Sequence, residues 1–490
     1  MARILRLDDT GRILPERPAS IMRALADASS LPPFHMPTAR IESLDQEGRG
    51  VAHPPDAGGK TIFIDGALIG EVVEYSSYRR KPTFEMADAI SIANPNASRV
   101  TPRCPHFGTC GGCALQHLDT AAQVASKQRT LEDALWHIGR VRPDRLLPAI
   151  YGPAWNYRNR ARLSVRDVTK KGEVLVGFHE KRSSFVADIH SCDVLPKRIS
   201  DLLLPLRRLI ESLSIRKRLP QIELACVDPV RVDEAPIDVL VLRLLEPLST
   251  ADLEQVKQFA DRHRVRFYAQ TAGPETAKPL YPDEDVLAYR LPEFAVTMPF
   301  RPTEFTQVNL AVNRVLVRRA VALLDPAPSE RIVDLFCGLG NFTLPIARRG
   351  GYTIGVEGSA SLVARARANA VANGLGDVTE FHRANLFEAT PEHFAAWGRI
   401  DKVMIDPPRE GAIEIVRSMP VAQVRRIVYV SCNASTLARD AGVLVNVHGY
   451  RFSAAGVVNM FPHTTHVESI ALFERDDDIG VTHIEQSPRN

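Results

Sequence analysis

From residue 331 onward the chain alternates between short apolar runs and helix-like stretches, and this alternation limits the fold more than any other feature. The apolar runs have the length and composition of buried strands; they are Ile332–Phe336, Tyr352–Val356, Val378–Phe381, Lys402–Asp406 and Arg426–Val430. Helices between buried strands predict parallel pairing, because a crossover is needed to return the chain to the same end of a sheet. We therefore expect a doubly wound, Rossmann-like α/β sheet whose ligands bind at the carboxyl ends of its strands.

The residues at those strand ends indicate the kind of ligand. Cys337–Phe342 is a glycine turn, but it lacks the third glycine that packs helix against strand around a pyrophosphate in nicotinamide enzymes. S-adenosylmethionine has no phosphate and tolerates such a turn, and Glu357 can accept hydrogen bonds from its ribose hydroxyls. The string Asp406–Arg409 strengthens this interpretation, since its two prolines would hold the backbone open beside the sulfonium.

Cys432 directly follows an apolar strand and suggests covalent attack on a pyrimidine ring. Uracil C5 is a poor nucleophile, but a thiolate that adds at C6 makes an enolate whose carbon terminus is C5. A base must later remove the C5 proton, and Glu468 suits this step, with His463 and His466 as rival bases at neutral pH. Arg409 would steady the charge that develops on O4.

Four of the seven cysteines are grouped: Cys104, Cys110, Cys113 and, far downstream, Cys192. A disulfide framework is not expected in an intracellular chain of this size. Four thiolates around one centre fit either a tetrahedral zinc ion or an iron–sulfur cluster. Glycines in the 104–113 loop would let the backbone direct amide N–H groups at sulfur, which favours the cluster. Cys226 and Cys337 lack such neighbours and are expected to be packing residues.

Upstream of the α/β region the chain has a different rhythm. Residues 37–102 contain alternating stretches bounded by glycine and proline, which predict a small β-barrel; the clearest are Lys60–Asp65, Gly70–Tyr75 and Ala87–Ile92. A helix is expected from about Thr120 to Gly139, with apolar residues at helical spacing: Leu131, Leu135 and Ile138. Residues 150–295 mix strands and helices.

Charge is distributed unevenly along the chain. The net charge of +3 is too small to imply a nucleic-acid partner by itself. Between Tyr151 and Arg198, however, ten Lys and Arg residues stand against five Asp and Glu residues, which is typical of a phosphate-binding face or of a solvated surface. Aromatic residues in this segment either stack on RNA bases or belong to the core: Trp155, Tyr157, Phe178 and Phe185.

No part of the sequence predicts a membrane-bound or secreted protein. It has no apolar run of about 18 residues, and its first 35 residues scatter arginines among short apolar pieces instead of forming a secretory signal. We expect a cytoplasmic monomer with a flexible N-terminal extension (residues 1–36), a flexible tail (residues 476–490) and no obligate protein partner.

Together these residues resemble the RNA uracil-C5-methyltransferases, and most closely the bacterial branch that makes 5-methyluridine in 23S ribosomal RNA. The resemblance spans about Ile41 to Phe473. It is carried by the four grouped cysteines and by the strings Phe305–Asn309, Asp334–Asn341, Asp406–Gly411, Val430–Asn433 and Met460–Glu468.

The resemblance implies a TRAM domain, an oligonucleotide-binding-type barrel, at residues 37–102, a mixed α+β central domain at 103–295 and a methyltransferase domain at 296–475. It implies a [4Fe-4S] cluster held by Cys104, Cys110, Cys113 and Cys192. It places S-adenosylmethionine among Gln307, Phe336, Asn341, Glu357, Asn385 and Asp406. Cys432 would be the nucleophile and Glu468 the general base in methylation of C5 of a specific uridine in 23S ribosomal RNA.

Three alternatives stay open. RNA 5-methylcytosine methyltransferases also attack C6 with a thiolate, but they usually carry a cysteine directly after the motif proline, where this chain has Pro408 and Arg409. A non-catalytic RNA-binding iron–sulfur protein would not need the intact set of Cys432, Glu468, Asp406 and Glu357. The transfer-RNA branch of the uracil enzymes typically lacks both the barrel and the cysteine set. For the cluster we favour a structural role over a redox one, and the choice of uridine stays open.

Overall fold

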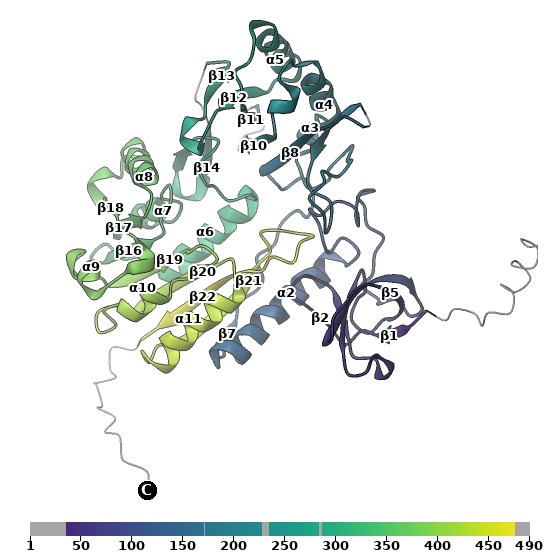
Figure 1. Ribbon diagram of the computed structural model, residues 1–490. Coiled ribbons are helices and arrows are strands. Elements are labelled where there is room, and N and C mark those ends of the chain that lie inside the picture. Colours follow the sequence, from purple (N-terminus) through teal and green to yellow (C-terminus); the bar gives the residue numbers. More distant parts are fainter. Residues whose placement is uncertain (1–35, 171, 228–234, 284–286, 476–490) are drawn as a thin grey trace, which may run out of the picture. The chain divides into compact units, whose positions relative to one another are not determined.

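The computed structural model describes residues 36–170, 172–227, 235–283 and 287–475 (Figure 1). The expected N-terminal extension, apart from Met36, and the expected tail lie outside the described residues. Internal contacts divide the chain into two compact units, one that runs to Ala97 without residues 46–48, and one made of 46–48 and everything from Ser98. Within the described ranges, no helix is long and apolar enough to cross a membrane.

The first unit is a six-stranded sheet that curls on itself (Figure 1) in the order β1-β5-β6-β4-β3-β2. Its strands are β1 Thr38–Arg40, β2 Ser43–Leu44, β3 Gly50–Ala52, β4 Thr61–Asp65, β5 Val72–Arg80 and β6 Phe84–Ile92. The three stretches expected to be strands from their alternation are β4, β5 and β6. Their inward side chains, including Ile62, Ile64 and Val73, form a small core of their own. Closure into a TRAM barrel stays a prediction.

The second unit contains a six-stranded sheet in the order β13-β12-β11-β10-β8-β9. Its strands are β8 Arg160–Val168, β9 Glu173–Gly177, β10 Gln221–Val227, β11 Ile237–Arg243, β12 Arg266–Gln270 and β13 Lys278–Tyr281. The helices that pack with it are α3 Lys197–Ser200, α4 Leu203–Ser212 and α5 Thr250–His263. Cys226, 2% exposed, is buried in this core, as expected for a packing residue.

The same unit contains an eight-stranded sheet in the order β18-β17-β16-β19-β20-β22-β21-β7. Its strands are β16 Arg331–Leu335, β17 Tyr352–Glu357, β18 Thr379–Arg383, β19 Lys402–Ile405, β20 Arg426–Ser431, β21 Arg451–Val458, β22 Glu468–Glu474 and β7 Arg145–Leu146. The five strands from β16 to β20 pair in parallel, which confirms the doubly wound α/β fold. β22 enters antiparallel to both of its neighbours.

Helices cover both faces of this sheet (Figure 1), which explains why its strands are apolar throughout rather than alternating. One core includes α6 Leu310–Leu324, α7 Thr343–Arg348, α8 Ala360–Ala372 and the hairpin of β14 Ala288–Leu291 and β15 Val296–Pro299. The other includes α2 Thr120–Ala134, α9 Pro391–Ala396, α10 Ile413–Ser418 and α11 Ala434–Asn446. Cys337 is buried in the first of these cores, again as expected.

The helix expected over residues 120–139 changes geometry near its end. α2 stops at Ala134 and continues as a π-helical turn, Leu135–Gly139. Leu135 is buried, but Ile138 is 50% exposed, so its predicted place on the apolar face was wrong. A π turn holds more residues than an α turn, and spacing learned from an α-helix then points to the wrong face. The turn lies against α11 so closely that a Cβ on Gly139 would come within 2.3 Å of the Ala438 carbonyl oxygen.

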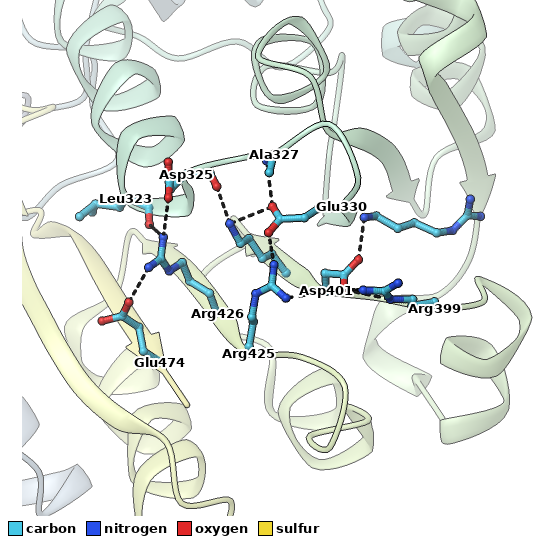
Figure 2. Close-up of polar contacts among 11 residues, drawn as sticks. Leu323, Asp325, Ala327, Glu330, Arg399, Asp401, Arg425, Arg426 and Glu474 are labelled. Atoms are coloured by element: carbon cyan, nitrogen blue, oxygen red, sulfur yellow. Dashed lines mark hydrogen bonds and ion pairs between the residues drawn. The ribbon is translucent and has the colours of Figure 1, made fainter. Parts of the chain in front are cut away.

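An ion network joins the strands of the eight-stranded sheet at the edge opposite their carboxyl ends (Figure 2). Glu330 is its buried centre, with Lys402 Nζ 2.8 Å from one carboxylate oxygen and Arg425 on the other. Burial alone would raise the pKa of Glu330, but hydrogen bonds from Lys402 and Ala327 and the charges of Lys402 and Arg425 outweigh it and hold the pKa below the ordinary value. The network therefore stabilises the folded protein above the unfolded-state pKa of glutamate, and this contribution is lost as the pH falls through the folded-state value.

We predict that Glu330→Gln lowers the free energy of unfolding by about 3–5 kcal/mol, because Lys402 would stay buried without a carboxylate. The measurement is denaturant unfolding at pH 7, monitored by a spectroscopic signal of the unit that contains the eight-stranded sheet. Asp201→Asn, which breaks the exposed Lys197–Asp201 pair, is the control and should cost no more than about 1 kcal/mol. Equal effects of the two changes would contradict a special role for the network.

Candidate active site

The eight-stranded sheet brings the candidate nucleophile and base to one edge. The parallel strands β16, β17, β19 and β20 all end there, and the antiparallel β22 begins there. Ser431 of β20 and Ser469 of β22 are register partners. Cys432 and Glu468 are the next residues beyond that pair, so they come from adjacent strands at the same level of the sheet.

Cys432 is half-buried just before α11, whose N-cap is Asn433. The positive end of a helix favours a thiolate. Burial and the nearby carboxylates of Glu468 and Asp406 act in the opposite direction and raise the pKa of Cys432 to about 11, although the Arg409 charge opposes them. At neutral pH the free site therefore holds a thiol, and attack requires that its proton be taken up nearby.

Glu468 has the properties of a general base. Its side chain is 5% exposed, and its Oε2 atom has no hydrogen-bond partner within the described residues. Burial, and then the Asp406 charge, raise the pKa of Glu468 to about 8, while Lys127 opposes the shift. A base with a pKa near the working pH transfers protons most effectively.

The loop that carries Asp406 is tied to α11. The Arg409 carbonyl oxygen accepts hydrogen bonds from Asn433 Nδ2 at 3.1 Å and from Thr436 Oγ1 at 3.3 Å. Farther along, the Ala412 N–H donates to the buried carboxylate of Asp440 at 2.8 Å. Burial raises the pKa of Asp406 to about 7, so this carboxyl can exist in its neutral, hydrogen-bond-donating form near neutral pH.

The two histidines proposed as rival bases have other partners. His463 is 1% exposed, stacks on Trp155 with ring centres 3.8 Å apart, and exchanges hydrogen bonds with Gln123. Burial lowers its pKa to about 4, so it is neutral at physiological pH. His466 is exposed, with Nδ1 3.0 Å from the Arg409 guanidinium. The geometry therefore favours Glu468 as the base.

The glycine turn and Glu357 form one side of a ligand site. Phe336, Gly338 and Gly340 have positive φ angles, and a Cβ on Gly338 would meet no atom within 4 Å, so the turn is open to an incoming group. The carboxylate of Glu357 accepts hydrogen bonds from the Gly338 N–H at 3.2 Å and the Ser359 N–H at 2.9 Å. The rings of Phe336 and the exposed Phe387 lie 5.7 Å apart. An acidic group beside apolar rings fits a nucleoside with free ribose hydroxyls.

The remaining residues assigned to the S-adenosylmethionine site differ in their burial and in how many of their polar atoms are free to bind a ligand. Asn341 Oδ1 accepts hydrogen bonds from Tyr289 and Asn313, and its Nδ2 donates back to Asn313, which leaves one amide N–H for a ligand. Gln307 is buried shortly before α6. Asn385 is exposed and caps a short helical turn through the Phe387 N–H. Tyr289 and Asn313 could not be predicted from the sequence, since no local pattern marks a hydrogen-bond partner this far away along the chain.

Asp334 lies beneath the turn and does not reach its ligand side. It is fully buried at the end of β16 and accepts a 2.5 Å hydrogen bond from Thr343 Oγ1. Burial raises its pKa to about 7. Its structural role is to hold the first turn of α7 against the strand.

The four grouped cysteines line a single cavity of 440 Å³. The same cavity is bordered by Arg409 and by Thr464, Thr465 and His466, which belong to the loop between β21 and β22. Its wall is tight at Gly111, where a Cβ would come within 3.1 Å of the His179 carbonyl oxygen. The loop of Cys104–Cys113 and the loop between β21 and β22 thus border one space.

The chemistry of this cavity fits a metal cluster. The Gly112 N–H points to Cys110 Sγ at 3.4 Å, as expected from the glycines of the loop. Burial raises the pKa of Cys113 to about 11 and that of Cys192 to about 12, so cations would have to displace their protons. Within the described ranges, no three His, Cys, Asp or Glu side chains are arranged around one metal ion. Four cysteine thiols that line one cavity can bind either a zinc ion or an iron–sulfur cluster.

The basic segment between residues 151 and 198 contributes both core and surface. Tyr157 is buried and donates a hydrogen bond to the Pro462 carbonyl at 3.0 Å, and Trp155 is engaged with His463. Arg160 pairs with Glu223 at 2.9 Å. Phe185, at 72% exposed, is the one of the four aromatic residues that presents its ring to solvent. It is the best placed of them to stack on a base.

Comparison with known sequences gives a consistent result. The model of the family described as tRNA (Uracil-5-)-methyltransferase matches residues 120–476. The chain is 62% identical to the 23S rRNA (uracil(1939)-C(5))-methyltransferase RlmD of Nitrosospira multiformis, over 89% of this chain and 98% of the relative. The proteins of the same name from Dechloromonas aromatica and Burkholderia pseudomallei are 58% and 55% identical, over 90% and 94% of this chain and 100% and 99% of theirs.

Comparison with solved structures supports the fold. A Pyrococcus abyssi tRNA (uracil-54, C5)-methyltransferase, solved in complex with S-adenosyl-L-homocysteine, superposes with a TM-score of 0.68 over 90% of this chain and 100% of that one. At 24% sequence identity the likeness shows a shared architecture.

We predict that alkylation of Cys432 by iodoacetamide is slow at neutral pH and rises steeply toward a midpoint near pH 11. Glu468→Gln should lower this midpoint, since it removes the carboxylate charge that disfavours the thiolate. The measurement is mass spectrometry of the peptide that contains Cys432. As a control, Glu474→Gln removes a carboxylate from the opposite end of β22 and should leave the midpoint unchanged. A midpoint that does not respond to Glu468→Gln would contradict the described pairing of thiol and carboxylate.

Proposed function

Because the chain belongs to the tRNA (uracil-5-)-methyltransferase family, we infer that it is a 23S ribosomal RNA (uracil-C5)-methyltransferase that takes its methyl group from S-adenosylmethionine. Relatives of that name are 55–62% identical to it over most of both chains. One structural observation carries the chemistry: Cys432 directly follows β20, Glu468 begins the adjacent β22, and Asp406 directly follows β19 at the same edge of the sheet.

The relatives also narrow the target. Their name specifies uracil 1939, and we propose that the corresponding uridine is the substrate here. The transfer-RNA alternative is less well supported, since the solved transfer-RNA enzyme is only 24% identical. A 5-methylcytosine activity is disfavoured because Arg409 follows Pro408 where those enzymes usually carry a cysteine.

In the first step the Cys432 sulfur bonds to C6 of the uracil ring, and the thiol proton leaves to water. The C5=C6 electron pair moves toward O4 and gives an enolate. Burial raises the pKa of Asp406 to about 7, so its neutral carboxyl can donate a hydrogen bond to the ring edge. The Arg409 guanidinium can balance the charge on O4. The target uracil must be unstacked from its neighbours to reach this site, so it is flipped out of a helix or lies in a single-stranded loop of the RNA.

In the second step C5 takes the methyl group. S-adenosylmethionine, when bound, supplies that methyl as an electrophile. Glu357 would hold its ribose, with Phe336 and Asn385 near the nucleoside and Gln307, Asn341 and Asp406 completing the site. The carboxylate of Glu468 then accepts the C5 proton, the C5–H electron pair forms the C5=C6 bond, and the C6–S bond breaks to release Cys432 as a thiolate.

We further propose that Cys104, Cys110, Cys113 and Cys192 hold a [4Fe-4S] cluster with a structural role. The thiols on one cavity wall and the amide directed at Cys110 support this assignment. The curled sheet of residues 38–92 is proposed to be a TRAM domain that binds RNA. The domain boundaries at residues 102 and 295, the monomeric state and the cytoplasmic location stay predictions.

We predict that Cys432→Ala binds a 23S RNA fragment and forms no covalent complex. Glu468→Gln should attack and methylate, then stall, so that a methylated protein–RNA adduct accumulates. Denaturing gels with labelled RNA and labelled methyl donor distinguish the two. A transfer-RNA transcript is the matched substrate control and should give no band. Turnover by Glu468→Gln at the wild-type rate would contradict the base assignment, and methylation of transfer RNA alone would contradict the substrate.

We predict about four irons per chain and a brown colour when the protein is purified without oxygen. Cys113→Ala should lose the colour and part of its solubility. Cys226→Ala, a change of another buried cysteine in the same core, should keep both. A colourless active protein with one zinc ion would overturn the cluster proposal.

A further inference from the structure

A β-hairpin that follows β9 carries the exposed Phe185 and has no role in the reaction described so far. Two hydrogen bonds close the hairpin: the Glu180 N–H donates to the Phe185 carbonyl oxygen and the Ala187 N–H to the Phe178 carbonyl oxygen, both at 2.8 Å. Its tip, residues 181–184, contains one lysine, one arginine and two serines. Residues 178–187 are called the arm below.

The arm is fixed to the loop of Cys104–Cys113. The Gly111 N–H donates to the His179 carbonyl oxygen at 2.9 Å, and the Lys181 N–H donates to the Thr109 carbonyl oxygen at 2.8 Å. A segment that is already held in place loses little conformational entropy when it binds a partner. The arm is therefore prepared to bind without first having to become ordered.

Phe185 presents its ring to solvent on this fixed support. Its side chain is 72% exposed, whereas that of the next residue, Val186, is buried. A single exposed apolar residue needs no explanation by itself. An aromatic ring on a rigid hairpin, however, is the kind of platform on which proteins stack an unpaired RNA base.

Two exposed arginines lie on the strand beside the arm. His179 Nε2 is 3.1 Å from Ser164 Oγ of β8. Arg162 and Arg166 stand two residues before and two residues after Ser164, so the three side chains share one face of the strand. The Arg162 side chain is 67% exposed, and Arg166 is exposed as well.

The acidic side chains around these arginines already have partners. Glu223 pairs with Arg160 at 2.9 Å and lies 3.7 Å from Arg162. Asp167 lies 3.4 Å from Arg216. The two carboxylates are thus shared among more guanidinium groups than they can neutralise. A surplus of positive charge at a surface attracts the phosphates of a nucleic acid.

The cysteine cavity relates this surface to the proposed uracil site. Phe178 of the arm and Gly111 line the cavity, and so do Arg409 and His466. Arg409 is the residue proposed to balance the charge on uracil O4. The arm therefore begins at a wall of the same 440 Å³ cavity that Arg409 borders, within reach of nucleotides next to the target.

We propose that the arm and the outward face of β8 bind the single-stranded RNA that flanks the target uridine. Phe185 stacks on one unpaired base, and Arg162 and Arg166 contact phosphates. This inference rests on the proposed function, since it names the surface that holds the neighbouring nucleotides of the substrate. The phosphate contacts position the strand, and the stacked base fixes its register relative to the uracil site.

The first measurement is the affinity for a 23S RNA fragment that contains the target uridine, by fluorescence anisotropy at several salt concentrations. We expect Phe185→Ala to weaken binding about 5–100-fold, which is the contribution of one base stacked on an aromatic side chain. Phe185→Trp keeps a stacking ring and should retain the wild-type affinity. Arg162→Gln and Arg166→Gln should each reduce the slope of log affinity against log salt by about 0.7–1.

The second measurement separates stacking from a general structural effect. RNA fragments that each lack one base near the target uridine are compared for the wild type and for Phe185→Ala. At the position that stacks on Phe185, loss of the base should weaken binding to the wild type and leave binding to Phe185→Ala unchanged. A structural effect would add equally to the loss of every base. Circular dichroism and binding of S-adenosylmethionine establish that each variant is folded.

Trp136→Ala is the matched control, because it removes another exposed aromatic ring, on the π-helical turn beside α11. It should change neither the affinity nor the pattern of base losses. Wild-type affinity in Phe185→Ala, additive effects at every position, or unchanged salt slopes in both arginine variants would overturn the proposal. Failure of the wild type to bind the fragment or to form a covalent adduct with it would instead refute the proposed function, so the two failures are distinguishable.

Discussion

The active site depends on one departure from parallel pairing. β22 runs antiparallel between β20 and β21, so its first residue stands at the edge where the parallel strands end. Without that reversal Glu468 would lie at the far edge of the sheet, one strand length from Cys432. The register Ser431–Ser469 then sets the level of the two groups to within one residue. Backbone hydrogen bonding therefore decides which carboxylate lies at the level of Cys432.

At the same edge, neighbouring acidic groups raise the pKa values of one another. Asp406 and Glu468 each raise the pKa of Cys432, and Asp406 raises that of Glu468. Burial raises the pKa of Asp406 to about 7, and burial together with the Asp406 charge raises that of Glu468 to about 8, close to the pH at which proton transfer is most effective. The opposite edge is built the other way, with Glu330 fully paired between Lys402 and Arg425. The buried ion network therefore lies at one edge of the sheet, and the acidic groups with raised pKa values lie at the other.

Much of this arrangement could be predicted from the sequence, because local patterns determine it. Apolar runs predict the buried strands. Glu357 and Cys432 could be predicted because each lies at the end of such a run. The burial of Lys127 on α2 could not be predicted in this way, since a lysine on a helix is exposed unless distant segments cover it. The mutual hydrogen bonds of Asn313 and Asn341 are also tertiary. Ile138 was misplaced because a π turn leaves no mark in residue spacing.

His463 is held by residues that precede it by most of the chain. Gln123 binds its ring and its backbone N–H across a separation of 340 residues, and Ala114 and Leu115 donate to its carbonyl. Synthesis proceeds from the N-terminus, so Gln123 is made 340 residues before His463. A nascent chain that stops before this loop therefore contains the anchoring residues but not Glu468, the carboxylate proposed as the general base. The loop that leads to Glu468 can therefore take up its folded position only after it has been synthesised and has packed against residues made about 340 positions earlier.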